Sequence, residues 1–449
     1  MDSHNRSEDR HKKIIKTAWT GLITRAISIA VSFLMVPLAI NYLGKEQYGL
    51  WIAVSSLVAM FGFMDGGAGN AVINLVAYSK GEKNNDLAKI VSTSFFSLMG
   101  LAILSCLLFL AIFPFVSWGW LLGVQELKLS QELNLVVIIV GLFFFLNMFV
   151  TLIGKIQRGL QEGNLDNFWA CIGTLLSLIF VYFAIQKNTG LIGFVAAFLG
   201  GSMFAYLLSN IHYFFFIRKD LMPRMRLVDG KIAKNLFKVG GMFFVLQIAA
   251  TIQGQADNVI IANMLGAGEV SVYAICMKLF LMIPMVLGLL LTPLWPAYRE
   301  AFTSGDTQWV KHIFLKSIRW SLFVSIPSAI ILFLIGAKFI EIWVGQDSVP
   351  SSNLLMGCSI WLIFMCLGNA LAVFLNGLQL VRIQIIVATT SAFMNIMLSV
   401  WLIPIMGVSG AVFGSVISYF IFTLIPYFII IRKMMANNDF SLKVQIIQQ

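Results

Sequence analysis

The sequence predicts an all-α polytopic membrane protein with twelve transmembrane helices arranged as two six-helix repeats. Three observations support this prediction. Hydrophobic residues make up 59% and charged residues 11% of the 449 positions, a composition unlike that of soluble domains. The apolar segments run for about 20 residues or more, which is the length that crosses a bilayer. Motifs of the first half of the chain also return in the second half at a nearly constant offset.

The apolar segments are continuous, which is typical of membrane helices and not of the alternating strands of a β-barrel. Polar residues lead directly into the first of them, so we expect a cytoplasmic tail and no signal peptide. The predicted spans are residues 14–42, 49–77, 90–117, 134–154, 167–186, 190–217, 239–264, 270–298, 314–337, 353–375, 385–403 and 408–431.

Lysine and arginine fall mainly on one side of these spans. With the amino terminus in the cytoplasm, 25 of the 31 basic residues lie in inner segments, 4 in outer segments and 2 within spans. By the positive-inside rule, this bias places both termini in the cytoplasm, as in a multi-pass protein of the bacterial inner membrane. It also accounts for most of the net charge of +11, so we expect the lipid bilayer and no nucleic acid as a partner.

The chain divides into two predicted bundles without an attached soluble domain. A cytoplasmic tail, 1–13, precedes the amino-terminal six-helix bundle, 14–217. The basic segment 218–238 is the predicted cytoplasmic linker. It leads to the carboxy-terminal six-helix bundle, 239–431, and a second cytoplasmic tail, 432–449.

Three sequence echoes relate the bundles, at offsets near 263 − 41 = 222 residues. Because each half holds an even number of spans, both halves have the same orientation and form a parallel repeat. Transporters use such repeats and bind their substrates between the halves. The echoes are NYLG at 41–44 with NMLG at 263–266, GLQ at 159–161 with GLQ at 377–379, and GLIGFVAAFLGG from Gly190 with GVSGAVFGSVIS from Gly407.

The hairpin of the seventh and eighth spans carries one charge in each apolar run. Asp257 lies eight positions before Leu265 and Lys278 ten after Gly268, which puts both about 12–15 Å from the turn. An intramembrane charge is a functional hypothesis, because it costs several kcal/mol unless it is paired or hydrated. Two interpretations stay open: an Asp257–Lys278 ion pair that fixes the hairpin, or an Asp257 that binds a proton or cation and couples transport to a gradient.

The first span carries Arg25 about 16 Å up the predicted helix, eleven residues from its start at 14. We expect it to meet water or an anion in a cavity, or a buried carboxylate such as Asp65. Asp65 lies in MDGGAGN, where three glycines predict an unwound or closely approached backbone. A polar face of the same predicted helix lies beside Arg25 and consists of Thr17, Thr20, Gly21, Thr24, Ser28 and Ser32. This face either packs against another helix or lines a cavity.

The seventh span repeats this pattern of polar residues. Gln247, the counterpart of Arg25 at the offset of 222, shares one face with Thr251, Gly254 and Asn258, and Gln255 lies beside that face. Gln253 and Asp257 project about a third of a turn away. We expect the first face to line a cavity and Asp257 to turn toward the eighth span.

Catalytic and cofactor motifs are absent from the sequence. It contains no Walker A sequence, no GxSxG motif and no metal-ligand spacing of His or Cys. The five cysteines lie in or beside apolar segments and are expected to pack there. We therefore expect a transporter without a cofactor or metal, not an enzyme, that is driven by a gradient of its substrate or of a coupling ion, H⁺ or Na⁺.

The segment QADNVIIANMLGAGEVSVYAICMKL (255–279) resembles the polysaccharide-transporter branch of the multidrug/oligosaccharidyl-lipid/polysaccharide (MOP) exporter superfamily. Further similar segments are INYLGKEQYGLW (40–51), MDGGAGNAV (64–72), PLWPAYREAF (293–302) and FLNGLQLVRIQI (374–385). The resemblance follows the order of the chain over essentially its whole length. It implies a MATE-like fold, in which two six-helix bundles surround a V-shaped central cavity that opens to each side in turn.

This resemblance implies an O-antigen flippase of the Wzx type. Such proteins move an undecaprenyl-pyrophosphate-linked oligosaccharide from the cytoplasmic to the periplasmic leaflet, and other polysaccharide-assembly membrane proteins are possible partners. A pyrophosphate needs cations in a water-filled cavity, for which Arg25 is the first candidate and Lys278 the second. Gln247, Gln255 and Asn258 are candidates for sugar hydroxyls, while ion coupling would depend on Asp257 or Asp65.

Two other functions remain open. A MATE-like multidrug or cation antiporter would need carboxylates in its cavity, and one aspartate would suffice. A membrane glycosyltransferase or polysaccharide polymerase would need a large outer loop or an acidic catalytic cluster, which the short outer segments do not favour.

Overall fold

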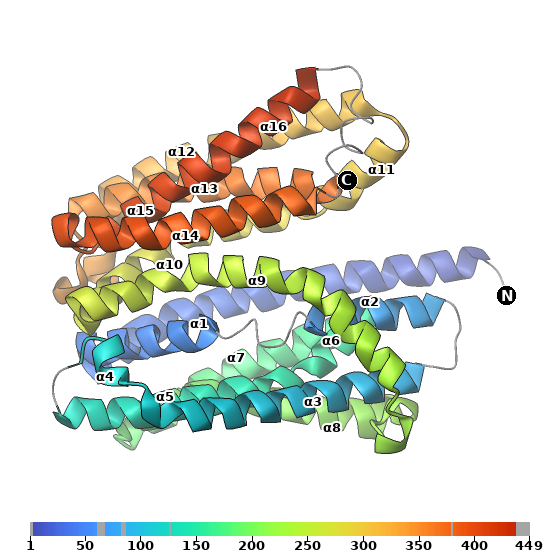
Figure 1. Cartoon of the computed structure of the whole chain (residues 1–449), viewed down its shortest axis with the longest axis horizontal. Coiled ribbons are helices and arrows are strands. Elements are labelled where there is room, and N and C mark those ends of the chain that lie inside the picture. The colour runs from blue at the N-terminus through green and yellow to red at the C-terminus, as the bar shows by residue number, and fades with distance from the viewer. Residues whose placement is uncertain (1–2, 61–67, 82–86, 125–126, 379, 437–449) are drawn as a thin grey trace. The chain divides into compact units, whose positions relative to one another are not determined.

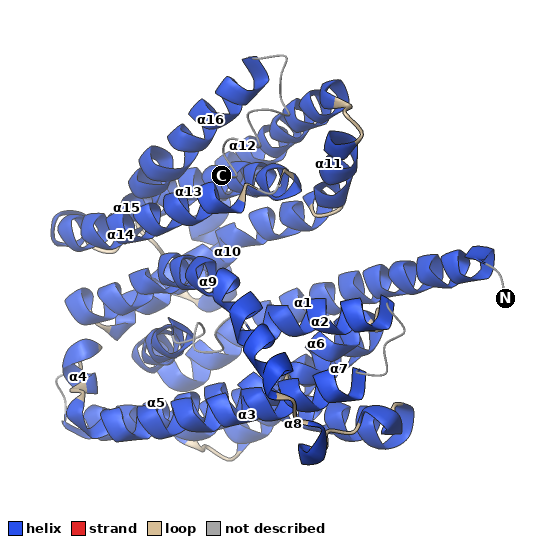
Figure 2. Ribbon diagram, turned by 45° about the vertical axis from the view of Figure 1, so that its right-hand side comes forward, coloured by secondary structure: helices blue, strands red, loops and turns tan. Residues whose placement is uncertain are grey.

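The computed structural model describes residues 3–60, 68–81, 87–124, 127–378 and 380–436 (Figure 1). Within these residues every regular element is a helix (Figure 2), so the predicted all-α class is confirmed. The α-helices are α1 (Ser3–Met60), α2 (Ala68–Gly81), α3 (Leu87–Ile112), α4 (Trp118–Leu121), α5 (Leu127–Val150), α6 (Leu152–Gly159), α7 (Gly163–Gln186), α8 (Gly190–His212), α9 (Gly230–Leu265), α10 (Ala267–Leu291), α11 (Leu294–Thr303), α12 (Thr307–Val344), α13 (Ser352–Gly377), α14 (Val381–Met406), α15 (Ser409–Tyr419) and α16 (Ile425–Ala436).

Ten helices of the described part are long and apolar enough to cross a membrane. Large apolar side chains also cover their outer surfaces: on α12, Phe323 is 70% and Leu334 71% exposed, as expected where lipid replaces water as the surrounding solvent. The protein is therefore a multi-pass membrane protein. The first of the ten, Trp19–Met60, joins the predicted first span to the start of the second, and the predicted seventh lies within α9. The count of twelve stays a prediction.

The chain forms two compact units whose limits differ from the predicted bundles. The first unit contains Met1–Gly44 and Leu57–Ile248, and the second contains Lys45–Ser56 and Ala249–Gln449. Residues 45–56, which we expected in the amino-terminal bundle, therefore belong with the carboxy-terminal unit. The beginning of α9 belongs with the first unit.

In the first unit, α7 packs along α8, α8 packs on α5, and α5 packs on α3 (Figure 1). Small residues allow α7 and α8 to approach closely: Gly173 faces Ser202 and Ala205, and Gly201 abuts the backbone of Ser177. Such small-residue contacts are the usual means of association where lipid removes the hydrophobic driving force between helices. A buried apolar cluster connects α2, α3, α6, the π-helical turn Tyr213–Ile217 and the start of α9.

The predicted linker is shorter than its basic composition suggested. Only 218–229 lies between the long helices, as short 3₁₀ turns, because α9 already begins at Gly230. Asp229 caps that helix, with its Oδ1 accepting from the backbone N of Lys231 at 2.7 Å. Asp220 lies beside the Arg218 guanidinium (Nη2 to Oδ2, 2.8 Å), which lowers the pKa of the Asp220 carboxyl. The linker is thus a structured segment of the first unit.

In the second unit, α14 packs along α15 as α7 packs along α8, and α12 packs on α13, which also contacts α10 (Figure 1). A second buried apolar cluster lies between α11, α12, α13, α14 and α16. Between α15 and α16 the helix passes through a π-helical turn, Phe420–Leu424.

Backbone angles support the internal repeat. Gly44 has φ 79° and ψ 169°, and its predicted counterpart Gly266 has φ 93° and ψ 166°. This region of backbone space is essentially restricted to glycine, so the two glycines are required by the same local geometry. A second predicted pair, Gly190 and Gly407, has φ 69° and 61°. The sequence echoes therefore mark equivalent turns in the two halves.

We expect Gly266→Ala to lower the apparent unfolding temperature of the detergent-solubilised protein. A Cβ there would meet nothing within 4 Å, so the cost of about 1–3 kcal/mol would come from backbone strain alone. Gly100→Ala is the matched control, because Gly100 lies inside α3 and its Cβ would also meet nothing within 4 Å. This control should be neutral or stabilising. Equal effects of the two substitutions would contradict the strained turn.

Candidate functional site

Asp257 is the centre of a buried polar cluster in the second unit. Its carboxylate accepts hydrogen bonds from Tyr273 Oη at 2.9 Å, Ser399 Oγ at 3.1 Å and Ser415 Oγ at 2.7 Å. These donors come from α10, α14 and α15, so the aspartate of α9 joins four helices. The side chain is only 5% exposed.

The cluster extends to a second set of oxygen atoms. Asn395 Oδ1 is a second acceptor within reach of the same serine hydroxyls, 3.0 Å from Ser399 Oγ and 3.2 Å from Ser415 Oγ. Ser399 Oγ also lies 3.3 Å from the Ala411 carbonyl oxygen. Carboxylate, amide, hydroxyl and carbonyl oxygens thus gather at one place, and the Asn395 amide nitrogen is buried without a hydrogen-bond partner in the described structure.

The predicted Asp257–Lys278 ion pair does not form. Three hydroxyl donors contact the carboxylate, and Lys278 makes no ion pair with any carboxylate in the described part of the chain. The prediction placed both residues at one level of the hairpin, which says nothing about their direction around each helix axis. Asp257 does turn toward α10, as expected, but it meets Tyr273 there.

Two further candidates on α9, Gln255 and Asn258, make no hydrogen bond to this cluster among the described residues. Asn258 donates from Nδ2 to Ser56 Oγ at 2.9 Å, and its Oδ1 is buried with no partner among the described residues. Gln255 is partly exposed, and the side chain of Gln247 lies outside the described part. The structure therefore does not bring the sugar-binding candidates together around one described feature.

Ser56 belongs to a segment, Lys45–Ser56, that packs within the second unit. The hydroxyl of Ser271 donates to the backbone oxygen of Lys45, and Lys45 Nζ lies 3.8 Å from Glu269 Oε1. Gly49 lies so close to the Ala267 carbonyl that a Cβ would collide with it. The turn at Gly44 thus directs this segment onto the start of α10.

The polar face of the first span is a helix-packing seam. Asn167 of α7 donates from Nδ2 to the Thr17 carbonyl at 3.0 Å and to Thr20 Oγ1 at 3.1 Å. Thr24 Oγ1 donates to the Asn167 carbonyl at 2.9 Å, and Ser28 and Thr174 hydroxyls are 3.4 Å apart. Of the two interpretations left open, this contact supports the seam for these residues.

Arg25 lies outside that seam. Its side chain is exposed, and it forms no ion pair with a carboxylate that the structure describes. The predicted alternative partner, Asp65, lies outside the described residues, so the pairing of these two remains a prediction.

A small hollow of about 210 Å³ with a mainly apolar lining lies elsewhere in the first unit. Asn147, Thr151 and Lys155 line it at intervals of four residues, together with Gly69 of the MDGGAGN motif. Next to this region along the chain, Arg158 pairs with Asp166 (Nε to Oδ2, 2.9 Å), so Arg158 is a structural cation rather than a free one.

Sequence reasoning missed most partners of Asp257. Asn395 and Ser399 lie four residues apart in an apolar span, which places them on one helix face, and Ser415 lies in the next apolar span. Polar side chains within membrane helices are costly and functional by default, so this signal was available. Their meeting with Asp257 depended on tertiary packing, which no local pattern reports.

Known proteins resemble this chain in both sequence and fold. A family model described as polysaccharide biosynthesis protein matches residues 15–302, which is 288 of 449 residues. The chain belongs to this polysaccharide biosynthesis protein family. It is 22% identical, over 74% of its length and 75% of the relative's, to a Yersinia pseudotuberculosis protein that carries the provisional name of O-antigen export protein.

Two solved structures resemble the fold closely. An inward-facing multidrug resistance MATE family transporter of the MOP superfamily has a TM-score of 0.72 and 15% identity, with 94% of this chain and 99% of that one covered. The lipid II flippase MurJ, in an inward closed conformation, has a TM-score of 0.72 and 16% identity, with 95% of each chain covered. The predicted MATE-like fold is confirmed.

We expect Asp257→Ala to destabilise the protein more than Asp257→Asn. Asparagine keeps one acceptor oxygen, whereas alanine leaves the buried Tyr273 hydroxyl without its acceptor, at a cost of about 1–3 kcal/mol. It also leaves Ser399 and Ser415 to share the single Asn395 Oδ1. Apparent unfolding temperatures in detergent would measure the difference. Equal temperatures for the two variants would contradict the hydrogen-bonded cluster.

The same measurement on Asp257→Asn, Lys278→Gln and the double variant tests the corrected geometry. Because the two side chains do not pair, their effects should add within about 0.5 kcal/mol. Recovery of stability in the double variant would show that the ion pair exists after all.

Proposed function

We propose that this protein is a flippase that moves an undecaprenyl-pyrophosphate-linked oligosaccharide from the cytoplasmic to the periplasmic leaflet of the bacterial inner membrane. The observation that carries the proposal is the match of residues 15–302 to the polysaccharide biosynthesis family, in a chain whose described helices form a MATE-like membrane transporter. The oligosaccharide would be the repeat unit of an O-antigen or a similar surface polysaccharide.

The names of two similar proteins support a lipid-linked substrate. The Yersinia relative is named for O-antigen export, and the MurJ structure is that of a lipid II flippase. A pathway that builds a polysaccharide on a lipid carrier needs a step that turns the finished unit across the bilayer. A transporter of this family with no catalytic motif in its sequence suits that step.

Arg25 is the proposed ligand of the pyrophosphate. Its guanidinium is exposed and has no described carboxylate partner, so its five donors are available to an anion. Lys278 is the second candidate, being partly buried and unpaired with any described carboxylate. Gln247, Gln255 and Asn258 are proposed to meet sugar hydroxyls, and the free Oδ1 of Asn258 could accept from one of them.

The Asp257 cluster is the proposed site of energy coupling. Hard cations such as Na⁺ prefer oxygen ligands, and the cluster gathers oxygens of Asp257, Asn395, Ser399 and Ser415 within hydrogen-bond distance of one another. Binding of Na⁺ would require the two serine hydroxyls to turn their lone pairs inward. Binding of H⁺ would need only protonation of the carboxylate. Either event changes the charge at a point that joins α9, α10, α14 and α15.

Deletion of the gene tests the flippase function. Extraction of lipid-linked oligosaccharides and a blot of surface polysaccharide would be made from the deletion strain and its complemented parent. We expect the repeat unit to accumulate on undecaprenyl pyrophosphate and the surface polymer to disappear. Unchanged polymer together with raised sensitivity to cationic drugs would contradict the proposal and favour a multidrug antiporter.

We expect Arg25→Ala to abolish surface polysaccharide while the protein still inserts into the membrane, because the pyrophosphate loses its cation. Arg25→Lys should restore part of the polymer, since lysine keeps the charge but not the planar set of donors. Lys187→Ala, at an exposed position of the first unit, is the control and should leave the polymer unchanged. Wild-type polymer from a normally expressed Arg25→Ala variant would exclude Arg25 as the ligand.

A further inference from the structure

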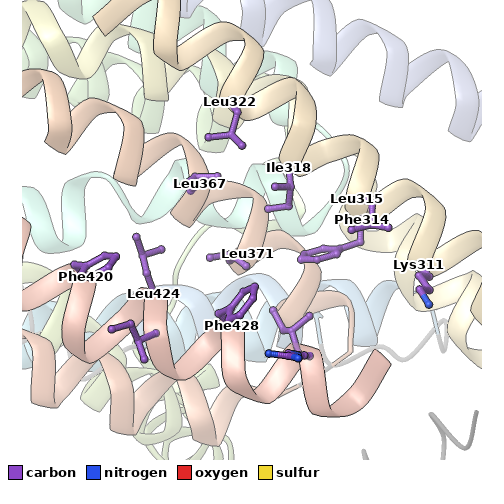
Figure 3. Close-up of a pocket in the computed structure, with 13 residues that line it drawn as sticks. Lys311, Phe314, Leu315, Ile318, Leu322, Leu367, Leu371, Phe420, Leu424 and Phe428 are labelled. Atoms are coloured by element: carbon purple, nitrogen blue, oxygen red, sulfur yellow. The ribbon is translucent and has the colours of Figure 1, made fainter. Parts of the chain in front are cut away.

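An apolar groove of about 730 Å³ runs along three helical segments of the second unit. It is lined by α12, α13 and the helix that continues from Phe420 through α16 (Figure 3). Phe314, Leu371 and Ile431 are buried and form its floor. Leu315 and Phe428, 41% and 64% exposed, stand at its rim, so a ligand can enter from the side.

Two cations are the charged residues of this lining. Lys311 comes from the start of α12 and Arg432 from α16. Both are exposed, and neither pairs with a carboxylate in the described structure. In Figure 3, Lys311 lies at one end of the labelled side chains and Phe420 at the other. The groove is therefore apolar along its length and positively charged at one end.

The dimensions of the groove match one leaflet of a bilayer. From Lys311 to Leu322, α12 advances eleven residues, or about 16 Å, which is half of a hydrocarbon core of about 30 Å. By the predicted topology, α12 starts and α16 ends in the cytoplasm. The charged end therefore lies at the cytoplasmic interface, and the apolar end reaches the middle of the membrane.

The wall of the groove contains an irregular helical turn. Phe420 and Leu424, which both line it, are the first and last residues of the π-helical turn Phe420–Leu424. Such turns carry an extra residue, are rare, and occur frequently at functional sites. This turn gives the apolar end a shape that a regular helix would not give it.

We propose that this groove holds the polyprenyl chain of a polyprenyl pyrophosphate, with the pyrophosphate between Lys311 and Arg432. The identity of the lipid rests on the proposed flippase function. Two cations from two helices suit the several negative charges of a pyrophosphate better than the single charge of an ordinary phosphodiester. The groove would receive the carrier while its headgroup is still on the cytoplasmic side.

Native mass spectrometry of the full-length purified protein tests this binding, because it separates bound lipids by mass. The probe is undecaprenyl pyrophosphate, offered alone and in competition with phosphatidylglycerol. We expect Lys311→Gln/Arg432→Gln to weaken binding of the probe about tenfold or more, since two charge-assisted contacts are lost. Leu315→Trp, which fills the rim without changing charge, should also weaken it.

Lys316→Gln/Lys433→Gln is the matched control. Both residues are exposed neighbours on the same two helices but lie outside the lining, so this variant removes equal charge and should keep wild-type binding. Equal loss from both double variants, or no loss from either, would overturn the proposal. Displacement of the probe by an equimolar amount of phosphatidylglycerol would also overturn it and identify a general anionic-lipid site.

The proposed lipid site in the groove and the proposed flippase function can be tested independently of each other. Suppose that gene deletion causes the lipid-linked unit to accumulate, and that the Lys311→Gln/Arg432→Gln variant restores normal surface polymer and binds the probe like the wild type. This result would overturn the proposed lipid site in the groove and leave the proposed flippase function intact. Selective binding of undecaprenyl pyrophosphate in the groove, with polymer unchanged on gene deletion, would support the groove and overturn the proposed function.

Discussion

A carboxylate enclosed by membrane helices has to find its hydrogen-bond donors inside the protein, because hydrocarbon offers none. Asp257 meets this constraint with hydroxyls from three other helices, Tyr273, Ser399 and Ser415. The helices that supply them are therefore held in one register around the acid. Protonation of this carboxylate, or binding of a cation to it, would change the hydrogen bonds that hold these helices together. A coupling site requires such a link between ion binding and helix packing. The arrangement explains why the second unit tolerates an acid at this depth without a neighbouring cation.

The two halves have equivalent backbone turns but different polar side chains within their membrane helices. Gly44 and Gly266 adopt nearly the same glycine-only conformation, so the repeat is built into the turns. At the same offset, however, Asp257 corresponds to position 257 − 222 = 35, which is the buried Met35, and Arg25 corresponds to Gln247. Each half carries an intramembrane cation, Arg25 in the first and Lys278 in the second, whereas Asp257 has no acidic counterpart at this offset. The polar cluster around Asp257 is therefore a feature of the second half that the repeat does not duplicate.

The fold was largely predictable from the sequence, and the site only in part. Long apolar runs and paired motifs depend on local composition, which is why the all-α class, most spans and the equivalent turns at Gly44 and Gly266 could be predicted. The unit boundaries could not, because Lys45–Ser56 changes units through contacts with Ala267 and Ser271 that are distant in sequence. Depth along a helix placed Asp257 and Lys278 at one level, but rotation about the helix axis decided that the acid meets Tyr273. The polar face of the first span looked equally suited to a cavity and to a seam, and Asn167 of α7 decided between them.

The function proposed for this chain is transport of a lipid-linked oligosaccharide across a bilayer. We would reconstitute the purified protein in liposomes that contain a lipid-linked oligosaccharide, and use an external glycosidase to measure the exposed fraction of the sugar over time. We expect an imposed H⁺ or Na⁺ gradient to accelerate exposure of the sugar above the rate of protein-free liposomes. Asp257→Asn should remove this response to the gradient. The proposed function would be wrong if the sugar were exposed no faster than in protein-free liposomes while the same protein transported a cationic dye in the same vesicles.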